Sequence, residues 1–128
     1  MEPGAGAVLY AKDLDRVAAF YSAVLGFEPA ARDDEHVLLE SPAFQLVVLR
    51  MPSHIAATIQ IPVPAVRRAN AAVKLVFFVP SLAGVRAAAA ARGGAMNGAD
   101  TEWLFNRWKV CDGIDPEGNV IQCREPAG

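Results

Sequence analysis

The sequence predicts an α+β fold made of two tandem β-α-β-β-β units. Two observations carry this prediction: each half contains one amphipathic helical stripe between apolar, strand-like runs, and the helix-capping residues recur at a fixed spacing. A chain of 128 residues is long enough to bury a core and fits a single domain, residues 1–128. We place unit one at about 5–50, a connector at 51–72 and unit two at 73–125.

Unit one begins with the apolar run 6–11, which favours a strand. Asp13 follows as a good N-cap residue, and Gly26 can end a helix in the left-handed conformation. Between them, apolar residues recur at helical spacing: Leu14, Val17, Ala18, Tyr21, Val24 and Leu25. Three further strands are predicted at 27–33, 36–41 and 44–50, separated by Asp33-Asp34 and Ser41-Pro42.

The connector contains Pro52, Pro62 and Pro64, and its apolar residues show no sustained helical or strand periodicity. We therefore expect at most one short helix or strand there. The pattern then restarts. The elements predicted for unit two are a strand at 73–79, a helix from the N-cap Ser81 to Gly93-Gly94, and strands at 101–106, 108–114 and 119–124.

The two units align with each other. A shift of about 68 positions places Asp13 on Ser81, Leu14 on Leu82, Val17 on Val85 and Gly26 on Gly94. A shift of about 74 places Ser41-Pro42 on Asp115-Pro116 and Arg50 on Arg124. We interpret this as an internal repeat, the alternative being two helix-plus-hairpin segments that share capping residues.

Composition excludes several classes of protein. A net charge of -2 provides no basic face for nucleic acid. No apolar run approaches the roughly 20 residues of a membrane span, and no signal peptide is visible. Two cysteines without a dense pattern fit free thiols in a reducing cytoplasm.

Two segments carry a family resemblance, "KDLDRVAAFYSAVLGFEP" (12–29) and "DGIDPEGNVIQCRE" (112–125). They resemble the signature segments of the vicinal oxygen chelate superfamily, which includes glyoxalase I, extradiol dioxygenases and bleomycin-resistance proteins. The resemblance implies that the units form curled mixed sheets around a ligand cavity. It also implies a homodimer, because small members commonly dimerise to complete or share their cavities.

Metal-using members of that superfamily place His, Gln or Glu on the first and last strand of each unit. Carried onto this chain, the four positions are Gly6, Val48, Lys74 and Gln122. A divalent catalytic metal usually needs about three ligands of imidazole, thiolate or carboxylate type, and these residues do not supply them. The two histidines, His36 and His54, fall at none of the four positions. We therefore expect no metal site and no cofactor.

Strand alternation assigns the predicted faces. The residues expected to face the cavity are Gly6, Val8 and Tyr10; Phe44, Leu46, Val48 and Arg50; Lys74, Val76 and Phe78; and Val120, Gln122 and Arg124. Those expected beneath the helices are Leu9, Val47, Leu49, Leu75, Phe77, Val79, Ile121 and Cys123. On this basis Cys123 is a small buried apolar residue, and Cys111 has no His partner to activate it.

The predicted ligand-binding residues are Tyr10, Phe44, Val48, Arg50, Lys74, Phe78, Trp103, Trp108, Gln122 and Arg124. Apolar and aromatic walls with a few cations suit an apolar or aromatic anionic ligand. Two alternatives stay open: the arginines can bend into solvent, and the aromatic side chains of 101–108 can seal a core or a dimer interface.

Three functions are consistent with this cavity. The first is a metal-independent small-molecule-binding protein of the glyoxalase/bleomycin-resistance type. The second is an enzyme, a lyase, isomerase or dioxygenase of the same superfamily, with Lys74 as the candidate catalytic residue acting as a base or as a charge that stabilises an enolate. The third is an interaction domain whose aromatic residues contact a partner.

Overall fold

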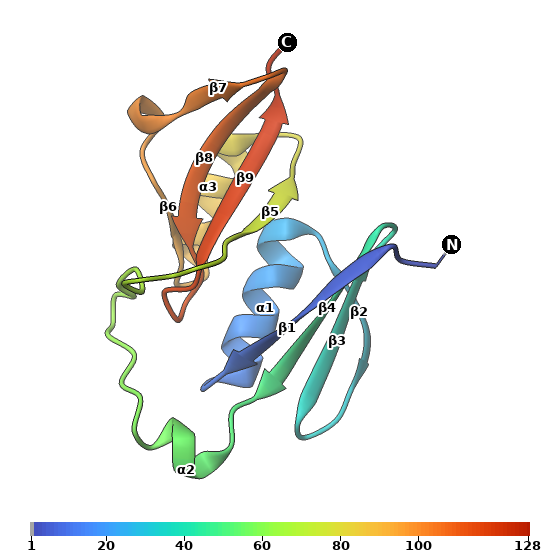
Figure 1. The fold of residues 1–128 in the computed structure, drawn as a ribbon, viewed down its shortest axis with the longest axis vertical. Coiled ribbons are helices and arrows are strands. Elements are labelled where there is room, and N and C mark those ends of the chain that lie inside the picture. The colour runs from blue at the N-terminus through green and yellow to red at the C-terminus, as the bar shows by residue number, and fades with distance from the viewer. Residues whose placement is uncertain (1) are drawn as a thin grey trace. The chain divides into compact units, whose positions relative to one another are not determined.

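The computed structural model describes residues 2–128, which divide into a first unit that ends at Gln60 and a second unit, Ile61–Gly128. Each unit contains one principal helix on a mixed sheet, with the strand order of a β-α-β-β-β motif (Figure 1). The predicted α+β fold is therefore confirmed.

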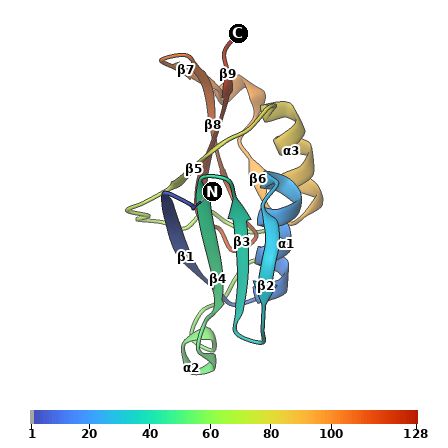
Figure 2. The same ribbon diagram turned by 90° about the vertical axis from the view of Figure 1, so that its right-hand side faces the viewer.

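Unit one comprises β1 (Ala5–Ala11), α1 (Leu14–Leu25), β2 (Glu28–Arg32), β3 (His36–Ser41), β4 (Phe44–Arg50) and the short helix α2 (Ser53–Ala56). Its four strands lie in the order β1-β4-β3-β2, as Figure 2 shows. The pair β1/β4 is parallel, and the other two pairs are antiparallel. The parallel pair requires a crossover, and α1 with the β2–β3 hairpin supplies it.

The ends of α1 follow the predicted signals. The Asp13 carboxylate accepts a hydrogen bond from the Arg16 amide at 3.1 Å, and Gly26 adopts a left-handed conformation with φ of 76°. The helix buries its apolar stripe against one face of the sheet. The fully buried residues of this core are Leu14, Val17, Phe20 and Tyr21 from α1, and Leu39, Leu46 and Val48 from the sheet.

Unit two comprises β5 (Leu75–Phe78), α3 (Leu82–Ala91), β6 (Ala95–Met96), the 3₁₀ turn η1 (Ala99–Thr101), β7 (Trp103–Phe105), β8 (Trp108–Ile114) and β9 (Val120–Pro126). Its sheet order is β5-β9-β8-β6, with β7 also paired to β8. The sequence did not predict β6 or η1, which are too short to show a period. Among the described residues, no helix is long and apolar enough to cross a membrane.

The helix α3 lies behind β8 and β9 in Figure 1. Ser81 caps it by accepting a hydrogen bond from the Gly84 amide at 3.0 Å, as predicted. Glu125 of β9 accepts a second bond, from the Leu82 amide at 2.6 Å. On the strands, Phe77, Ile121 and Cys123 face α3 and are buried, in agreement with the predicted faces.

The predicted face of β4 is wrong. Val48 and Leu46 are fully buried in the α1 core, and they lie beside Val37 and Leu39 of β3. The opposite face of β4 carries Gln45, Val47 and Leu49. Val47 and Leu49 lie beside Val8 and Tyr10 of β1. Because side chains alternate along a strand, a register error of one residue exchanges the two faces completely.

The error arises in the second hairpin. Two residues separate the paired Ser41 and Phe44 at the β3–β4 turn. At the β8–β9 turn, three residues separate Asp115 and Asn119, whose backbone groups are hydrogen-bonded at 3.0 Å. The added residue shifts β9 by one position against β4, so that the structural counterpart of Gln122 is Val47 and that of Cys123 is Val48.

Candidate functional site

The candidate site is the sheet face of unit two that lies opposite α3, which we call the helix-free face. Strand alternation and the strand pairing place the following side chains on it: Val76 and Phe78 of β5; Val120, Gln122 and Arg124 of β9; Trp108, Val110 and Asp112 of β8; and Trp103 and Phe105 of β7. Lys74 immediately precedes β5 and reaches the same face through Asp112.

A chain of polar side chains crosses the centre of this face. The Lys74 ammonium donates to Oδ2 of Asp112 at 2.8 Å, and the Gln122 amide donates to Oδ1 of the same carboxylate at 3.0 Å. Nε of Arg124 then donates to Oε1 of Gln122 at 2.8 Å. Gln122 and Asp112 are neighbours across the β8/β9 pair, so the backbone register itself holds this network together.

Aromatic rings surround the end of the network. The Arg124 guanidinium lies 5.0 Å from the ring centroid of Phe105 and 5.9 Å from that of Phe78. Trp108 packs edge-on against Phe78, with centroids 4.7 Å apart. The Phe78 and Phe105 side chains remain 60% and 55% exposed, so their faces are available to a planar ligand.

Arg124 has no carboxylate partner. No described Asp or Glu lies within ion-pair distance of its guanidinium, and its Nε is its only donor with a hydrogen-bond acceptor in the described chain. Lys74, in contrast, is neutralised by Asp112. On the helix-free face, the Arg124 guanidinium is therefore a positive charge that no described carboxylate neutralises, and it lies between aromatic rings.

Six of the ten predicted binding residues lie on this face: Lys74, Phe78, Trp103, Trp108, Gln122 and Arg124. The structure brings them together, and their role in binding a ligand stays a prediction. Asp112 was not predicted, because an acidic residue near a hairpin turn is common and carries no local sign of a partner 38 residues away. Its position ten residues before Gln122, across a hairpin centred at 117, is the signal that could have found it.

The four predicted residues of unit one do not share a face. Tyr10 lies on the helix-free face of its own sheet and is 54% exposed. Val48 and Phe44 point to the α1 side, where the Phe44 ring packs against Phe27. Arg50 is on that side too, and its Nε donates to the Asp34 carbonyl at 2.9 Å. The cavity-facing assignments of Phe44, Val48 and Arg50 are therefore corrected.

The residues at the superfamily's metal positions do not fit a metal ion. Gly6 has no side chain, and Val48 has no donor atom. Val47, which occupies the helix-free face in place of Val48, has none either. Lys74 is a cation held by Asp112, and Oε1 of Gln122 already accepts from Arg124. Among residues 2–128, no group of three or more His, Cys, Asp or Glu side chains is arranged to hold a metal.

The cysteines belong to the core and not to the site. Cys111 and Cys123 are paired across β8 and β9 on the α3 face, and both are fully buried as free thiols. Burial raises the pKa of the Cys123 thiol to about 12, with smaller contributions from Cys111 and Asp112. A thiol with so high a pKa is a poor nucleophile at neutral pH.

Solved structures of similar fold place this arrangement in a known class. They include a glyoxalase/bleomycin resistance protein from Albidiferax ferrireducens T118, with 21% identity, a TM-score of 0.66 and coverage of 95% of this chain and 96% of that one. The fosfomycin resistance protein FosX from Listeria monocytogenes matches with 14% identity, a TM-score of 0.64 and coverage of 92% and 88%. TnmS3, an antibiotic binding protein from Streptomyces sp. CB03234, matches with 18% identity, a TM-score of 0.62 and coverage of 98% and 96%.

These likenesses show that the fold is the one found in glyoxalase/bleomycin resistance proteins. A family model then gives the more specific assignment. Residues 6–123 match the model described as a glyoxalase-like domain, and the chain belongs to that family. No curated protein sequence matches the chain.

Proposed function

We propose that the protein binds an aromatic, anionic small molecule on the helix-free face of unit two without a metal ion. The observation that carries the proposal is Arg124, a half-buried guanidinium between two exposed rings and without a carboxylate partner. An arginine in such a place can hold a carboxylate through two parallel hydrogen bonds.

The surrounding network supports an arginine of fixed orientation. Gln122 accepts from Nε, which leaves the two terminal nitrogens of Arg124 for the ligand. Asp112 fixes the orientation of the Gln122 amide by accepting from its nitrogen. A cation that is already oriented loses less side-chain entropy when the ligand binds, so its contact contributes more to affinity.

Metal independence is part of the proposal. It is supported by the absence of a suitable donor set at the expected positions, since Lys74 contributes a positive charge and Gln122 is fully engaged. Binding of the fosfomycin or antibiotic class named for the neighbours does not follow from this fold alone. What supports a small-molecule role here is the aromatic surface around Arg124, a cation without a carboxylate partner among the described residues.

An enzyme of the lyase, isomerase or dioxygenase type is the second candidate, favoured by one observation. The Lys74 ammonium lies 2.8 Å from Asp112 Oδ2 on the same face as Arg124. An ammonium that donates to a carboxylate acts as a fixed charge, so its role would be to stabilise an oxyanion and not to remove a proton. Turnover that disappears in Lys74→Met while ligand affinity is retained would favour this candidate over simple binding.

We further propose that the protein is a cytoplasmic homodimer. Buried free thiols fit a reducing compartment. Exposed apolar side chains on the helix-free faces, such as Val8 and Tyr10, favour burial against a second chain. Light scattering on the purified protein would test this, and a monomer at micromolar concentration would contradict it.

The binding proposal is tested with biphenyl-4-carboxylate, following tryptophan fluorescence. We expect Arg124→Met to weaken binding at least tenfold. Arg92→Met is the matched control, because Arg92 is an exposed arginine at the end of α3, away from the site, and its loss should leave affinity unchanged.

Chelator is the second arm of that test. Affinity should be the same with and without EDTA. Equal affinity of the Arg124→Met variant and wild type would overturn the proposed site. About one tightly held divalent ion per chain, together with loss of binding in EDTA, would overturn metal independence.

A further inference from the structure

The segment that precedes β5 is fixed to the β8–β9 hairpin. The Arg68 amide donates to the Gly118 carbonyl at 3.0 Å, and Nε of Arg68 donates to the Glu117 carbonyl at the same distance. Gly118 permits this approach, because a Cβ at that position would lie 2.1 Å from the Val66 carbonyl oxygen. The backbone on both sides of Arg67 is therefore held against the hairpin.

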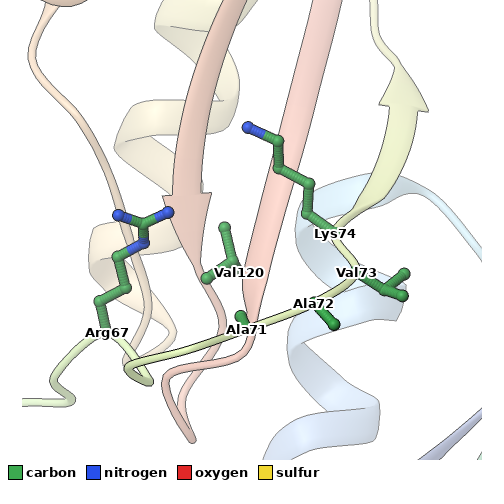
Figure 3. Close-up of a pocket in the computed structure, with 6 residues that line it drawn as sticks. All are labelled: Arg67, Ala71, Ala72, Val73, Lys74 and Val120. Carbon is green, nitrogen blue, oxygen red and sulfur yellow. The ribbon is translucent and has the colours of Figure 1, made fainter.

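Arg67 lines a pocket of about 190 Å³ in unit two. The other lining residues are Ala71, Ala72, Val73, Lys74 and Val120. Figure 3 shows the cationic ends of Arg67 and Lys74 extending in the same direction, with Val120 between them. Val120 is the apolar side chain between the two long ones, and the Ala72 and Val73 side chains point away from them in this view.

The pocket has an excess of positive charge. Lys74 is balanced by Asp112, but the Arg67 guanidinium has no hydrogen-bond acceptor and no ion-pair partner among the residues that the structure describes. One water occupies about 30 Å³ of liquid, so the volume is enough for one acid group and part of the body that carries it. A carboxylate, sulfonate or phosphate group fits both the size and the charge.

This pocket and Arg124 lie at two ends of β9. Val120 lines the pocket, and Arg124 is four residues further along the same strand. At about 3.3 Å per residue, the two positions are roughly 13 Å apart. Gln122 lies between them on the same face.

We propose that Arg67 and Lys74 form a second anion subsite, so that the ligand is an aromatic diacid lying along β9. One acid group contacts Arg124, the aromatic body lies over Val76, which is exposed beside the buried Gln122, and the other acid group enters between Arg67 and Lys74. This inference rests on the proposed binding function and specifies its ligand class. It also gives a role to Arg67, which lies in the connector and is not among the binding residues predicted from the sequence.

The test compares biphenyl-4-carboxylate with biphenyl-4,4′-dicarboxylate at constant ionic strength. We expect the dicarboxylate to bind wild type at least tenfold more tightly. Arg67→Met should abolish that advantage and leave the affinity for the monocarboxylate unchanged. Because the exposed Arg67 side chain has no hydrogen-bond or ion-pair partner among the described residues, the variant should unfold at the wild-type temperature.

Each other outcome overturns the inference. If Arg67→Met weakens the binding of both probes equally, Arg67 contributes only a long-range electrostatic attraction and does not contact the second acid group. If the dicarboxylate has no advantage while Arg124→Met still abolishes binding, the second subsite is wrong and the proposed function stands. If neither probe binds wild type, both proposals fall.

Discussion

The two units share a topology but differ in the chemistry of their helix-free faces. In unit one, β1 and β4 place Val8, Tyr10, Val47 and Leu49 on that face, and β3 adds Leu38 with His36 and Glu40 on either side of it. In unit two the corresponding strands carry Lys74, Asp112, Gln122 and Arg124, joined by hydrogen bonds. The helix-facing sides, in contrast, are apolar in both units.

This difference separates what holds the fold from what equips a site. Each sheet is stabilised by burying one face under its helix, and aliphatic and aromatic residues do that in both units. The second face is free of that requirement, so its residues can differ without changing the topology. Among the described residues, unit two carries a hydrogen-bonded network of charged and polar side chains on this face, and for that reason we propose the site there.

The largest expected effect tests the β4 register on which the comparison depends. Leu46→Ala should lower the free energy of unfolding by about 2–5 kcal/mol, because Leu46 is fully buried under α1. Leu49→Ala is the matched control on the opposite, half-buried face and should cost clearly less. Urea unfolding of both variants measures the difference, and the reverse order would restore the register expected from the sequence.

The next test concerns Gly118, which lies in the longer turn of the β8–β9 hairpin. Gly118→Ala should destabilise the protein by about 2–3 kcal/mol, since φ is 81° and the new Cβ would meet the Val66 carbonyl oxygen. Gly26→Ala in unit one is the control, because φ is 76° there but no atom lies within 4 Å of the Cβ. Its cost should be about 1 kcal/mol. If thermal unfolding shows equal losses of stability for the two variants, the close approach of Gly118 to the Val66 carbonyl oxygen does not contribute to the cost.

A reciprocal exchange tests the polar network. Gln122→Val, which copies the counterpart residue Val47, should destabilise by about 1 kcal/mol because Asp112 and Arg124 each lose a hydrogen bond. It should also weaken binding of biphenyl-4-carboxylate, since Arg124 is no longer oriented. Val47→Gln should leave that binding unchanged. If both variants bind as wild type does, Gln122 has no positioning role.

The smallest effect at neutral pH is expected for Cys123→Val, which copies the core residue Val48. The cost at pH 7 should stay below about 1 kcal/mol, because the exchange nearly conserves volume. Burial raises the pKa of the Cys123 thiol to about 12, from an ordinary value near 9. The unfolded chain thus releases this proton first, and wild-type stability should fall as the pH rises from about 9 towards 12. A pH series of urea unfolding should show a shallower fall for the variant, and parallel curves would contradict the assignment.

Much of the fold could be predicted because its signals are local. Asp13 and Ser81 cap their helices as expected, since a side chain reaches an amide only three residues away. The strands at 36–41, 44–50 and 108–114 have the predicted bounds, because apolar runs between turn residues mark them directly. In unit two the predicted faces also hold, and they bring Gln122 and Arg124 to one side.

Register and charge pairing were decided by the tertiary structure. Sequence similarity between the hairpins could not show that Asp115–Asn119 contains one residue more than Ser41–Phe44, and that residue exchanged the faces of β4. The partnership of Lys74 with Asp112 joins positions 38 residues apart, and Arg67 is fixed only through its neighbour's bonds to the hairpin. The sequence by itself determined which segments are helices and strands, because those preferences act within a few residues. Only the folded sheet determined which cation is neutralised and which is left for a ligand, because that depends on contacts between distant segments.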